Sequence, residues 1–189
     1  MKHHASCLFS SVVHSIQTES NSKLLEFCLE QHKADPKGLT ISNHGGWQSK
    51  QMQKGIAYEE LSKILDKSIQ TVLTKKIEID GLWININPPN SYNIVHNHPA
   101  FHFSGVYYVQ VPENSGKILF ENPHTFDAFS EIQSYSDDFK YDTSQYYAVD
   151  IQGKEGLLLV FPSYLRHGVH INKSELDRIS ISFNARVIE

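Results

Sequence analysis

Two segments near the front of the chain place apolar residues at helical spacing. In residues 22–33 apolar side chains recur three and four positions apart, before a break at Asp35 and Pro36. Residues 58–73 repeat that spacing over a longer stretch. Residues that could cap the first helix are Ser20, Asn21 and Ser22. The patterns predict two amphipathic helices, and because their polar faces mix both charge signs we expect them to pack on a sheet.

From residue 77 onward the apolar period changes from helical to two. Apolar side chains alternate along 77–87 until Pro88 and Pro89 break the pattern. Further strands are predicted at 92–97, 105–111, 116–120, 145–151, 156–161, 167–171 and 178–187. No helical pattern separates these strands, which disfavours a purely parallel α/β architecture. The series of short strands predicts a mainly β fold, either a sandwich or a jelly-roll barrel.

The length of 189 residues fits one domain of ordinary size. We expect a single domain over residues 1–189, with a helical part at about 1–75 and a barrel at about 76–189. The longest interruption of the barrel is 121–144, which holds six acidic residues and a single lysine. Its length suggests a lid or an insertion over a site, while a solvated surface excursion would explain its charge equally well.

Composition and charge disfavour several classes of protein. The chain has 21 acidic and 17 basic residues, for a net charge of −4, so we expect no binding to nucleic acid through a basic surface. No run approaches the ~20 apolar residues that span a bilayer, so we expect no membrane segment. Cys7 and Cys28 are too few for a disulfide framework and indicate two buried thiols in a reducing compartment. The cytoplasm is therefore the expected location.

Histidine is the unusual residue of this composition, with 11 copies against 2 Cys, 2 Met and 2 Trp. His96, His98 and His102 fall within seven residues at the end of a predicted strand. Side chains two positions apart on a strand project from the same face, so His96 and His98 can converge on one ion. Imidazole suits zinc, iron, copper and nickel. A surface loop that happens to be rich in histidine is the alternative.

A third ligand should come from a distant strand, because barrel sites gather side chains from several strands. His167 is the best candidate, since it follows the buried strand at 156–161 and a turn. His170 is a rival three residues later, and His167 could also be a packed histidine of the core. The spacing by itself does not choose between these possibilities.

Arg178 opens the last predicted strand and strengthens the case for a site. Strand alternation places Arg178 and Ser180 on the face opposite Ile179 and Ile181. A guanidinium aimed inward is costly unless it meets an anion, and its fork matches a carboxylate. The alternative is an exposed arginine on an edge strand, or one that pairs with Asp177.

A family likeness runs through several of these segments. They are Ser42–Ser49, Trp83–Asn87, His96–Pro99, Ser104–Tyr108, Ser115–Phe120, Phe161–Ser163, His167 and Arg178–Asn184. Through them nearly the whole chain resembles the Fe(II)- and 2-oxoglutarate-dependent oxygenases, in particular a family of small bacterial and phage members. The segments are specific together, whereas none of them is specific alone.

The resemblance implies a double-stranded β-helix, which is a jelly roll or cupin-like barrel, behind two packing helices. In such enzymes the open end of the barrel holds iron, so the likeness gives His96 the proximal histidine position and His167 the distal one. The likeness also implies that Arg178 and Ser180 bind the carboxylate of 2-oxoglutarate that lies farther from the iron. Further residues that could bind this cosubstrate or a ligand are Asn85, Asn93 and Tyr107.

The chain departs from the family pattern at His98, which stands where a carboxylate is usual. A neutral imidazole leaves one more positive charge at an Fe(II) site than a carboxylate would. A site of three histidines, His96, His98 and His167, can still bind iron, and we prefer it because the two-residue spacing already places His98. The alternative is a carboxylate from Glu121 or Asp127.

The resemblance implies an Fe(II)- and 2-oxoglutarate-dependent dioxygenase that uses O2, hydroxylates a small-molecule or peptide substrate, and releases succinate and CO2. No catalytic residue is expected beyond the metal ligands. A cupin that uses a metal without 2-oxoglutarate is the nearest rival, although cupins normally place a Glu near the position of His102. A jelly-roll module that binds a ligand without catalysis is a third possibility. The oligomeric state and the substrate stay open.

Overall fold

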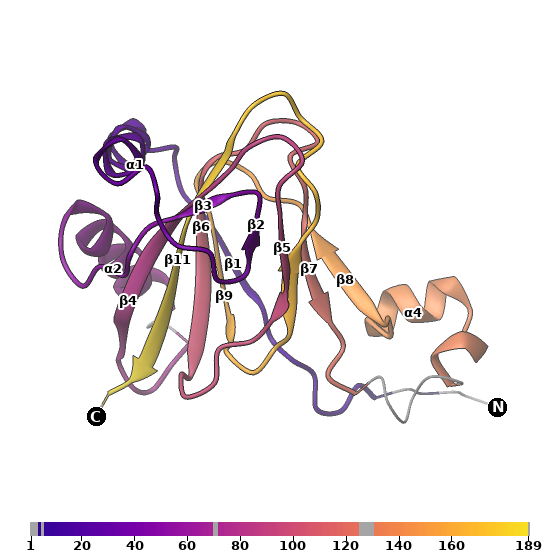
Figure 1. The fold of residues 1–189 in the computed structure, drawn as a ribbon. Coiled ribbons are helices and arrows are strands. Elements are labelled where there is room, and N and C mark those ends of the chain that lie inside the picture. The colour runs from indigo at the N-terminus through magenta and orange to yellow at the C-terminus, as the bar shows by residue number, and fades with distance from the viewer. Residues whose placement is uncertain (1–3, 5, 70–71, 125–130, 189) are drawn as a thin grey trace.

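A computed structural model describes residues 4, 6–69, 72–124 and 131–188. Its strands form two antiparallel sheets that face each other (Figure 1). The larger sheet has the order β1 (His14–Gln17), β9 (Leu157–Pro162), β6 (Phe103–Gln110), β11 (Arg178–Val187), β4 (Ile77–Asn87) and β3 (Trp47–Gln48). The smaller sheet has the order β2 (Asn43–His44), β5 (Tyr92–His96), β10 (His167–Val169), β7 (Ile118–Glu121) and β8 (Ala148–Ile151). The mainly β, jelly-roll architecture is confirmed.

Two helices cover the outer face of the larger sheet, as the apolar spacing predicts (Figure 1). Helix α1 spans Ser22–Ala34, and the Asn21 side chain caps it by accepting hydrogen bonds from two backbone N–H groups of its first turn. Helix α2 spans Ile56–Ser68, so it begins and ends earlier than predicted. Within the described residues no helix has the length and apolarity needed to cross a membrane.

Strand alternation divides the side chains of β11 between two environments. Ile179, Ile181 and Phe183 face the helices and belong to a core that includes Leu24 of α1 and Leu61 of α2. The alternate residues of β11 face the smaller sheet instead. A second apolar cluster lies on that side, and its members come from β6, β7, β9 and the loop after β9: Val106, Tyr108, Ile118, Phe120, Leu157, Leu159, Phe161 and Leu165. The space between the sheets is therefore apolar at one side and polar where β11 begins.

The front of the chain is not only helical, which corrects the predicted division near residue 75. Strand β1 pairs with β9 at the edge of the larger sheet. Strands β2 and β3 pair with β5 and β4, one in each sheet. The sequence pattern missed them because strands of two to four residues are too short to show a period.

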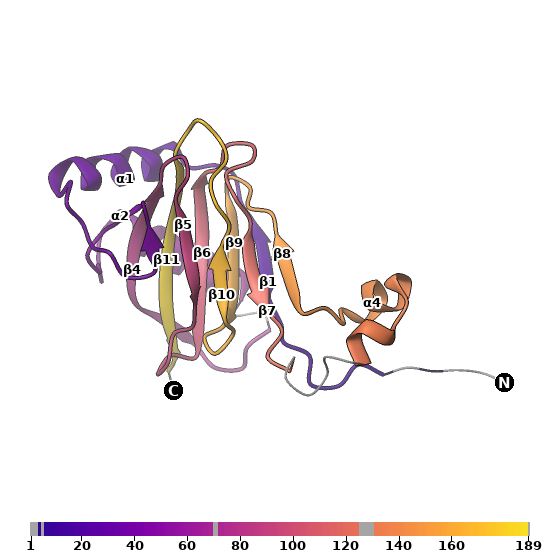
Figure 2. The same cartoon turned by 45° about the vertical axis from the view of Figure 1, so that its right-hand side comes forward.

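The long excursion between β7 and β8 carries helix α4 (Asp137–Thr143). Figure 2 shows α4 standing away from the barrel beyond the ends of β7 and β8. None of its residues is buried, which favours a solvated excursion for this part. Asp127, the alternative metal ligand, lies outside the described residues.

Both cysteines are free thiols, but only one of them is buried. Cys28 lies in the core beneath α1 and is 0% exposed. Cys7 is exposed, so the prediction of two buried thiols is wrong for it. Its segment precedes β1 and does not enter the core.

Candidate metal centre and cosubstrate pocket

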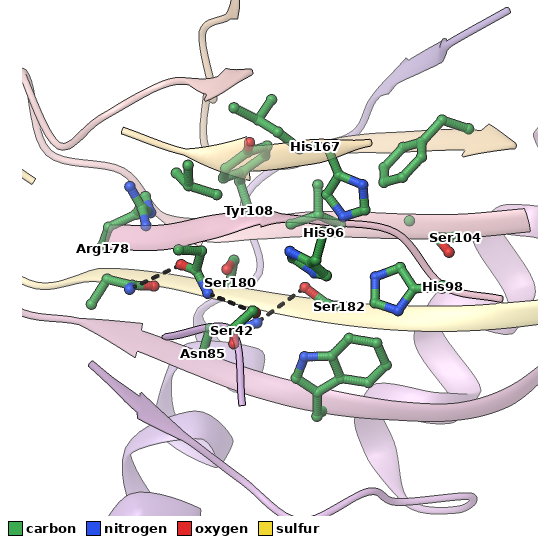
Figure 3. Close-up of a pocket in the computed structure, with 18 residues that line it drawn as sticks. Ser42, Asn85, His96, His98, Ser104, Tyr108, His167, Arg178, Ser180 and Ser182 are labelled. Atoms are coloured by element: carbon green, nitrogen blue, oxygen red, sulfur yellow. Dashed lines mark hydrogen bonds between the residues drawn. The ribbon is translucent and has the colours of Figure 1, made fainter. Parts of the chain in front are cut away.

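A pocket lies between the two sheets and is lined by residues of both (Figure 3). Its lining consists of Ser42, Trp83, Asn85, Asn87, Asn93, His96, His98, Ser104, Gly105, Val106, Tyr108, Ile118, Phe161, His167, Val169, Arg178, Ser180 and Ser182. In the close-up three histidine rings gather at one side, while Arg178 stands at the opposite side. The pocket thus has two chemically distinct ends.

His96 and His167 come from neighbouring strands and are opposite each other in the register of β5 and β10. Their ring centroids lie 4.5 Å apart. Nδ1 of His96 lies 2.8 Å from the carbonyl oxygen of Ile94, and Nδ1 of His167 lies 2.9 Å from that of Leu165. A carbonyl oxygen only accepts hydrogen bonds, so each Nδ1 carries the proton. The lone pair of each Nε2 is therefore free to bind a metal ion.

His98 lies two residues beyond the end of β5 and completes the cluster. Its ring centroid is 4.9 Å from that of His96 and 5.2 Å from that of His167. One nitrogen of each ring lies within 4.8 Å of the others. Trp83 packs beside the His98 ring, with 5.7 Å between the ring centroids. The predicted convergence of the three imidazoles is present in the structure.

The environment keeps these imidazoles neutral. Burial lowers the pKa of His98 to about 3, and the neighbouring His167 and His96 act in the same direction. Burial also lowers the pKa of His167 to about 4 and lowers that of His96, although the hydrogen bond from each ring to a backbone carbonyl acts in the opposite direction. Metal ions bind the neutral form of imidazole, so the three side chains are ready for a divalent ion near pH 7.

The other candidate metal ligands, His170 and Glu121, bind side chains outside the histidine cluster. His170 is half exposed, with its Nε2 2.9 Å from a carboxylate oxygen of Asp150. Glu121 forms an ion pair with Arg166, with 2.6 Å between Oε2 and Nε. Among the described residues, the three histidines form the group of potential ligands that converges on one point. The structure therefore favours His167 over His170 and gives no support to Glu121 as a ligand.

Arg178 occupies the end of the pocket away from the histidines and is 2% exposed. Its Nη1 donates a hydrogen bond to the carbonyl oxygen of Ser115. Burial lowers the pKa of the guanidinium to about 10, which leaves it charged near pH 7. The described residues that line the pocket include no carboxylate to pair with it. A buried, unpaired cation of this kind is suited to an anionic ligand.

Gly116 allows the turn before β7 to approach Arg178. Its φ is +91°, and a Cβ atom there would lie 2.2 Å from the carbonyl oxygen of His170 and 2.9 Å from Nη1 of Arg178. Any larger residue would displace the turn that carries Ser115. The glycine thus preserves the backbone acceptor that orients one arm of the guanidinium.

Strand register places the remaining predicted residues. Ser180 pairs with Asn85 on β4, and both side chains line the pocket. Nδ2 of Asn85 donates to the hydroxyl of Ser182 at 3.0 Å, which fixes the orientation of the amide. Asn93 also lines the pocket and accepts a hydrogen bond from Asn87 at 3.2 Å.

The prediction for Tyr107 is wrong, because its side chain faces the helices. Its hydroxyl lies 3.3 Å from Oγ1 of Thr18 and donates to the carbonyl of Glu19 at 3.4 Å. The neighbouring Tyr108 lines the pocket instead. A bulge between β6 and β11 aligns Tyr108 with Ser180, so both lie on the same face. Nothing in the sequence marks this bulge, so sequence reasoning could not have selected Tyr108.

Comparison with known proteins gives a family match over residues 81–184, to the family described as "Putative 2OG-Fe(II) oxygenase". The matched part covers more than half of the chain and includes the three histidines and Arg178. This match supports the oxygenase hypothesis over the two alternatives that the sequence left open, a cupin and a non-catalytic binding module. The search of curated proteins gave no match.

Solved structures with a similar fold belong to oxygenases of several organisms. A prolyl-4-hydroxylase from Pseudomonas putida is 13% identical, with a TM-score of 0.63 and 96% of each chain covered. HygX from Streptomyces hygroscopicus, with nickel and 2-oxoglutarate bound, is 11% identical, with a TM-score of 0.64 and 94% and 83% of the two chains covered. The viral collagen prolyl hydroxylase vCPH from Paramecium Bursaria Chlorella virus-1, in complex with 2-oxoglutarate, is 15% identical, with a TM-score of 0.59 and coverage of 97% and 100%.

At these identities the structural likeness establishes the double-stranded β-helix fold, while the family match carries the chemistry. A cluster of neutral imidazoles fits Fe(II), and a buried guanidinium in the same pocket fits a dicarboxylate. The chain therefore belongs to the 2-oxoglutarate- and Fe(II)-dependent oxygenases, and it is an oxidoreductase that uses iron and 2-oxoglutarate.

Proposed function

We propose that His96, His98 and His167 are the protein ligands of the Fe(II) ion. The observation that carries this proposal is the convergence of their ring nitrogens within 4.8 Å. Backbone carbonyls hold two of the rings in the tautomer that leaves Nε2 free. The low pKa values of His98 and His167 support the same assignment, since a ligand must be unprotonated.

Arg178 and Ser180 bind the far carboxylate of 2-oxoglutarate in this proposal. A guanidinium can grip a carboxylate with two parallel hydrogen bonds, and the Ser180 hydroxyl lies on the same face of β11. Asn85, Asn93 and Tyr108 line the same pocket and offer polar groups to the rest of the cosubstrate. In this group of cosubstrate-binding residues, Tyr108 takes the place that the sequence analysis gave to Tyr107.

Bound Fe(II), together with 2-oxoglutarate and O2, supplies an oxidant for an unactivated C–H bond and leaves succinate and CO2. The protein's own residues bind and orient the reactants, and we assign no catalytic residue beyond the metal ligands. The apolar side chains between the sheets, such as Phe161 and Val106, limit the access of water to the pocket. We infer that the outcome is hydroxylation of a small molecule or a peptide.

We also propose that residues 1–189 act as a single domain and that the protein works in the cytoplasm. The support for the first is that strands from the front of the chain join both sheets. The support for the second is the presence of two free cysteines, which fits a reducing compartment. Fusion to a fluorescent protein in the source cells would test the location, and a secreted or surface-bound fusion would contradict it.

The experiment that tests the function is anaerobic titration of the protein with Fe(II) and 2-oxoglutarate. A 2-oxo acid that chelates Fe(II) should give a weak visible charge-transfer band. Wild-type protein should develop the band, and His167→Ala should not. Exposure to O2 should then convert 2-oxoglutarate slowly to succinate even without substrate. Iron that binds without any band or succinate would contradict the proposal.

A further inference from the structure

Trp83 is a buried aromatic residue that belongs to neither apolar cluster of the protein. It is 9% exposed, and its side chain lines the pocket between the sheets. Among the buried apolar side chains on the described strands, it is the one that both clusters leave out. Its neighbours Leu82 and Ile84 face the helices, so strand alternation turns Trp83 toward the smaller sheet. Packing of the apolar core therefore does not account for a tryptophan at this position.

The indole N–H of Trp83 has no hydrogen-bond acceptor among the described residues. The other tryptophan of the chain, Trp47, donates its Nε1–H to the carbonyl oxygen of Asp35 at 2.8 Å and belongs to the core beneath the helices. A buried indole N–H ordinarily finds a partner, because an unpaired donor costs free energy. We therefore expect the partner of Trp83 to be a molecule that enters the pocket.

Ser182 places a second hydrogen-bond donor beside Trp83. The two residues are opposite each other in the register of β4 and β11, and both side chains line the pocket. The Ser182 hydroxyl accepts a hydrogen bond from Nδ2 of Asn85, and its own proton has no acceptor among the described residues. Opposite residues of antiparallel strands have Cβ atoms about 5 Å apart, so both donors can reach one oxygen atom.

These two donors lie at the metal end of the pocket. Figure 3 shows Arg178, Ser180 and Ser182 in this order along β11, with His98 beyond Ser182. The ring centroids of Trp83 and His98 are 5.7 Å apart. The strand positions of Arg178 and Ser182 are about 13 Å apart, which exceeds the length of a five-carbon acid. A cosubstrate held by Arg178 and Ser180 therefore leaves Trp83 and Ser182 to another molecule.

We propose that Trp83 and Ser182 form the subsite that binds a carbonyl oxygen of the oxygenase's substrate. The proposal rests on the metal and cosubstrate assignments made above. A carbonyl oxygen has two lone pairs, so it can accept from the indole N–H and from the hydroxyl at once. The ring of Trp83 also offers an apolar face to the carbon atoms next to the carbonyl. The substrate is therefore a carbonyl compound, held with a neighbouring C–H bond close to the metal.

Cyclopentanone and methylenecyclopentane are a matched pair of probes for this subsite, because they have the same shape and only the ketone carries an oxygen acceptor. Each is added to the whole chain at saturating Co(II) and 2-oxoglutarate, and the relaxation of its protons is measured by NMR. Co(II) is paramagnetic and accelerates the relaxation of a probe that binds beside it, while Zn(II) gives the diamagnetic reference. Wild-type protein should accelerate the relaxation of the ketone and bind the alkene at least about threefold more weakly.

Variants of the two donors test their roles separately. Trp83→Phe keeps an aromatic ring but removes the N–H, so it should weaken the binding of cyclopentanone about three- to tenfold. Ser182→Ala removes the hydroxyl and should have a similar effect. Trp47→Phe is the matched control, since that indole binds Asp35 away from the pocket, and it should bind the ketone as wild type does. A general loss of structure would weaken both probes, whereas loss of a donor weakens only the ketone.

The outcomes separate the subsite from the proposed function. Failure of 2-oxoglutarate to bind at saturating Co(II) would overturn both. Bound 2-oxoglutarate without faster relaxation of cyclopentanone would overturn the subsite and leave the function standing. Equal binding of the two probes, or ketone binding that Trp83→Phe and Ser182→Ala both leave unchanged, would also overturn the subsite. The comparison of the two probes on wild-type protein decides the point even when a variant does not fold.

Discussion

The backbone N–H of His98 donates a hydrogen bond to the carbonyl oxygen of Ser163, with 3.0 Å between the two atoms. Ser163 in turn donates its own N–H to the carbonyl of His102 at 3.1 Å, and its hydroxyl lies 2.8 Å from that of Ser104. His98 lies outside β5, so these bonds to the loop after β9 position its ring. The third histidine thus depends on a contact between loops.

Arg186 of β11 anchors the loop after β5, which carries His98, and replacing this arginine should weaken the metal site. Its Nη1 donates to the carbonyl of Ala100 at 2.8 Å, and the guanidinium lies 4.7 Å from the centroid of the Phe101 ring. We expect Arg186→Ala to lower Co(II) affinity about tenfold, the smaller end of the effect of residues that orient metal ligands. Equilibrium dialysis measures the change.

Asp80→Asn is the matched control for this prediction. It removes the ion pair with Arg186, whose Nε lies 2.5 Å from a carboxylate oxygen, but leaves the contacts with the loop. Its Co(II) affinity should stay close to that of wild type. An equal loss in both variants would show that the ion pair, rather than the loop contacts, matters for the site.

Replacing His96 or His167 by Ala should abolish stoichiometric binding of one divalent ion. Each change deletes a nitrogen whose orientation the backbone has already set. His170→Ala serves as the control, since that side chain binds Asp150 away from the cluster. Inductively coupled plasma mass spectrometry on dialysed protein gives the stoichiometry. Retention of one tightly bound ion by the His96 or His167 variant would refute the ligand assignment.

Arg178→Ala should weaken 2-oxoglutarate binding by ~2–4 kcal/mol, about thirty- to a thousand-fold, as expected when one partner of a desolvated charge pair is removed. Arg178→Lys should recover only part of this loss, because a point charge cannot reproduce the guanidinium fork. Anaerobic calorimetric titration at saturating Co(II) is the measurement. The same affinity in wild type and the Ala variant would place the cosubstrate elsewhere.

The metal-free protein should lose stability as the pH falls below about 6.5. The pKa of His98 is about 3 and that of His167 about 4 in the folded protein, against 6.5 as the ordinary value for an unfolded chain. The unfolded chain therefore takes up protons first, so the stability present above pH 6.5 is lost progressively on acidification.

Urea unfolding at pH 7 and pH 5 measures this loss for wild type and His98→Asn. Each of the two strongly shifted histidines should account for about 1–2 kcal/mol of the difference between the two pH values. The variant should therefore show a smaller difference. A pH dependence identical to that of wild type would contradict a low pKa for His98.

Thiol reagents should distinguish the two cysteines. Burial raises the pKa of Cys28 to about 12, so at pH 8 it is protonated and also shielded from the reagent. Cys7 is exposed. Titration with Ellman's reagent should detect one thiol in the native protein and two after denaturation. Detection of two fast thiols in native protein would contradict the burial of α1 against the sheet.

Local patterns in the sequence were sufficient to predict which residues of β11 face the site. The period of two along β11 places Arg178 and Ser180 opposite Ile179, and the structure has that arrangement. The alternation follows from the backbone of one strand, which needs no partner to define its two faces. The spacing of His96 and His98 is a local feature of the same kind.

Contacts between distant segments decided the rest. Which tyrosine faces the pocket depends on the bulge that pairs Ser180 with Tyr108, and which histidine completes the cluster depends on the pairing of His167 with His96. The sequence by itself determined the family, through motifs that are specific in combination, and the two faces of β11, because strand alternation needs no partner strand. Only the tertiary structure decided which candidates meet, because register between strands is set by packing across the whole barrel.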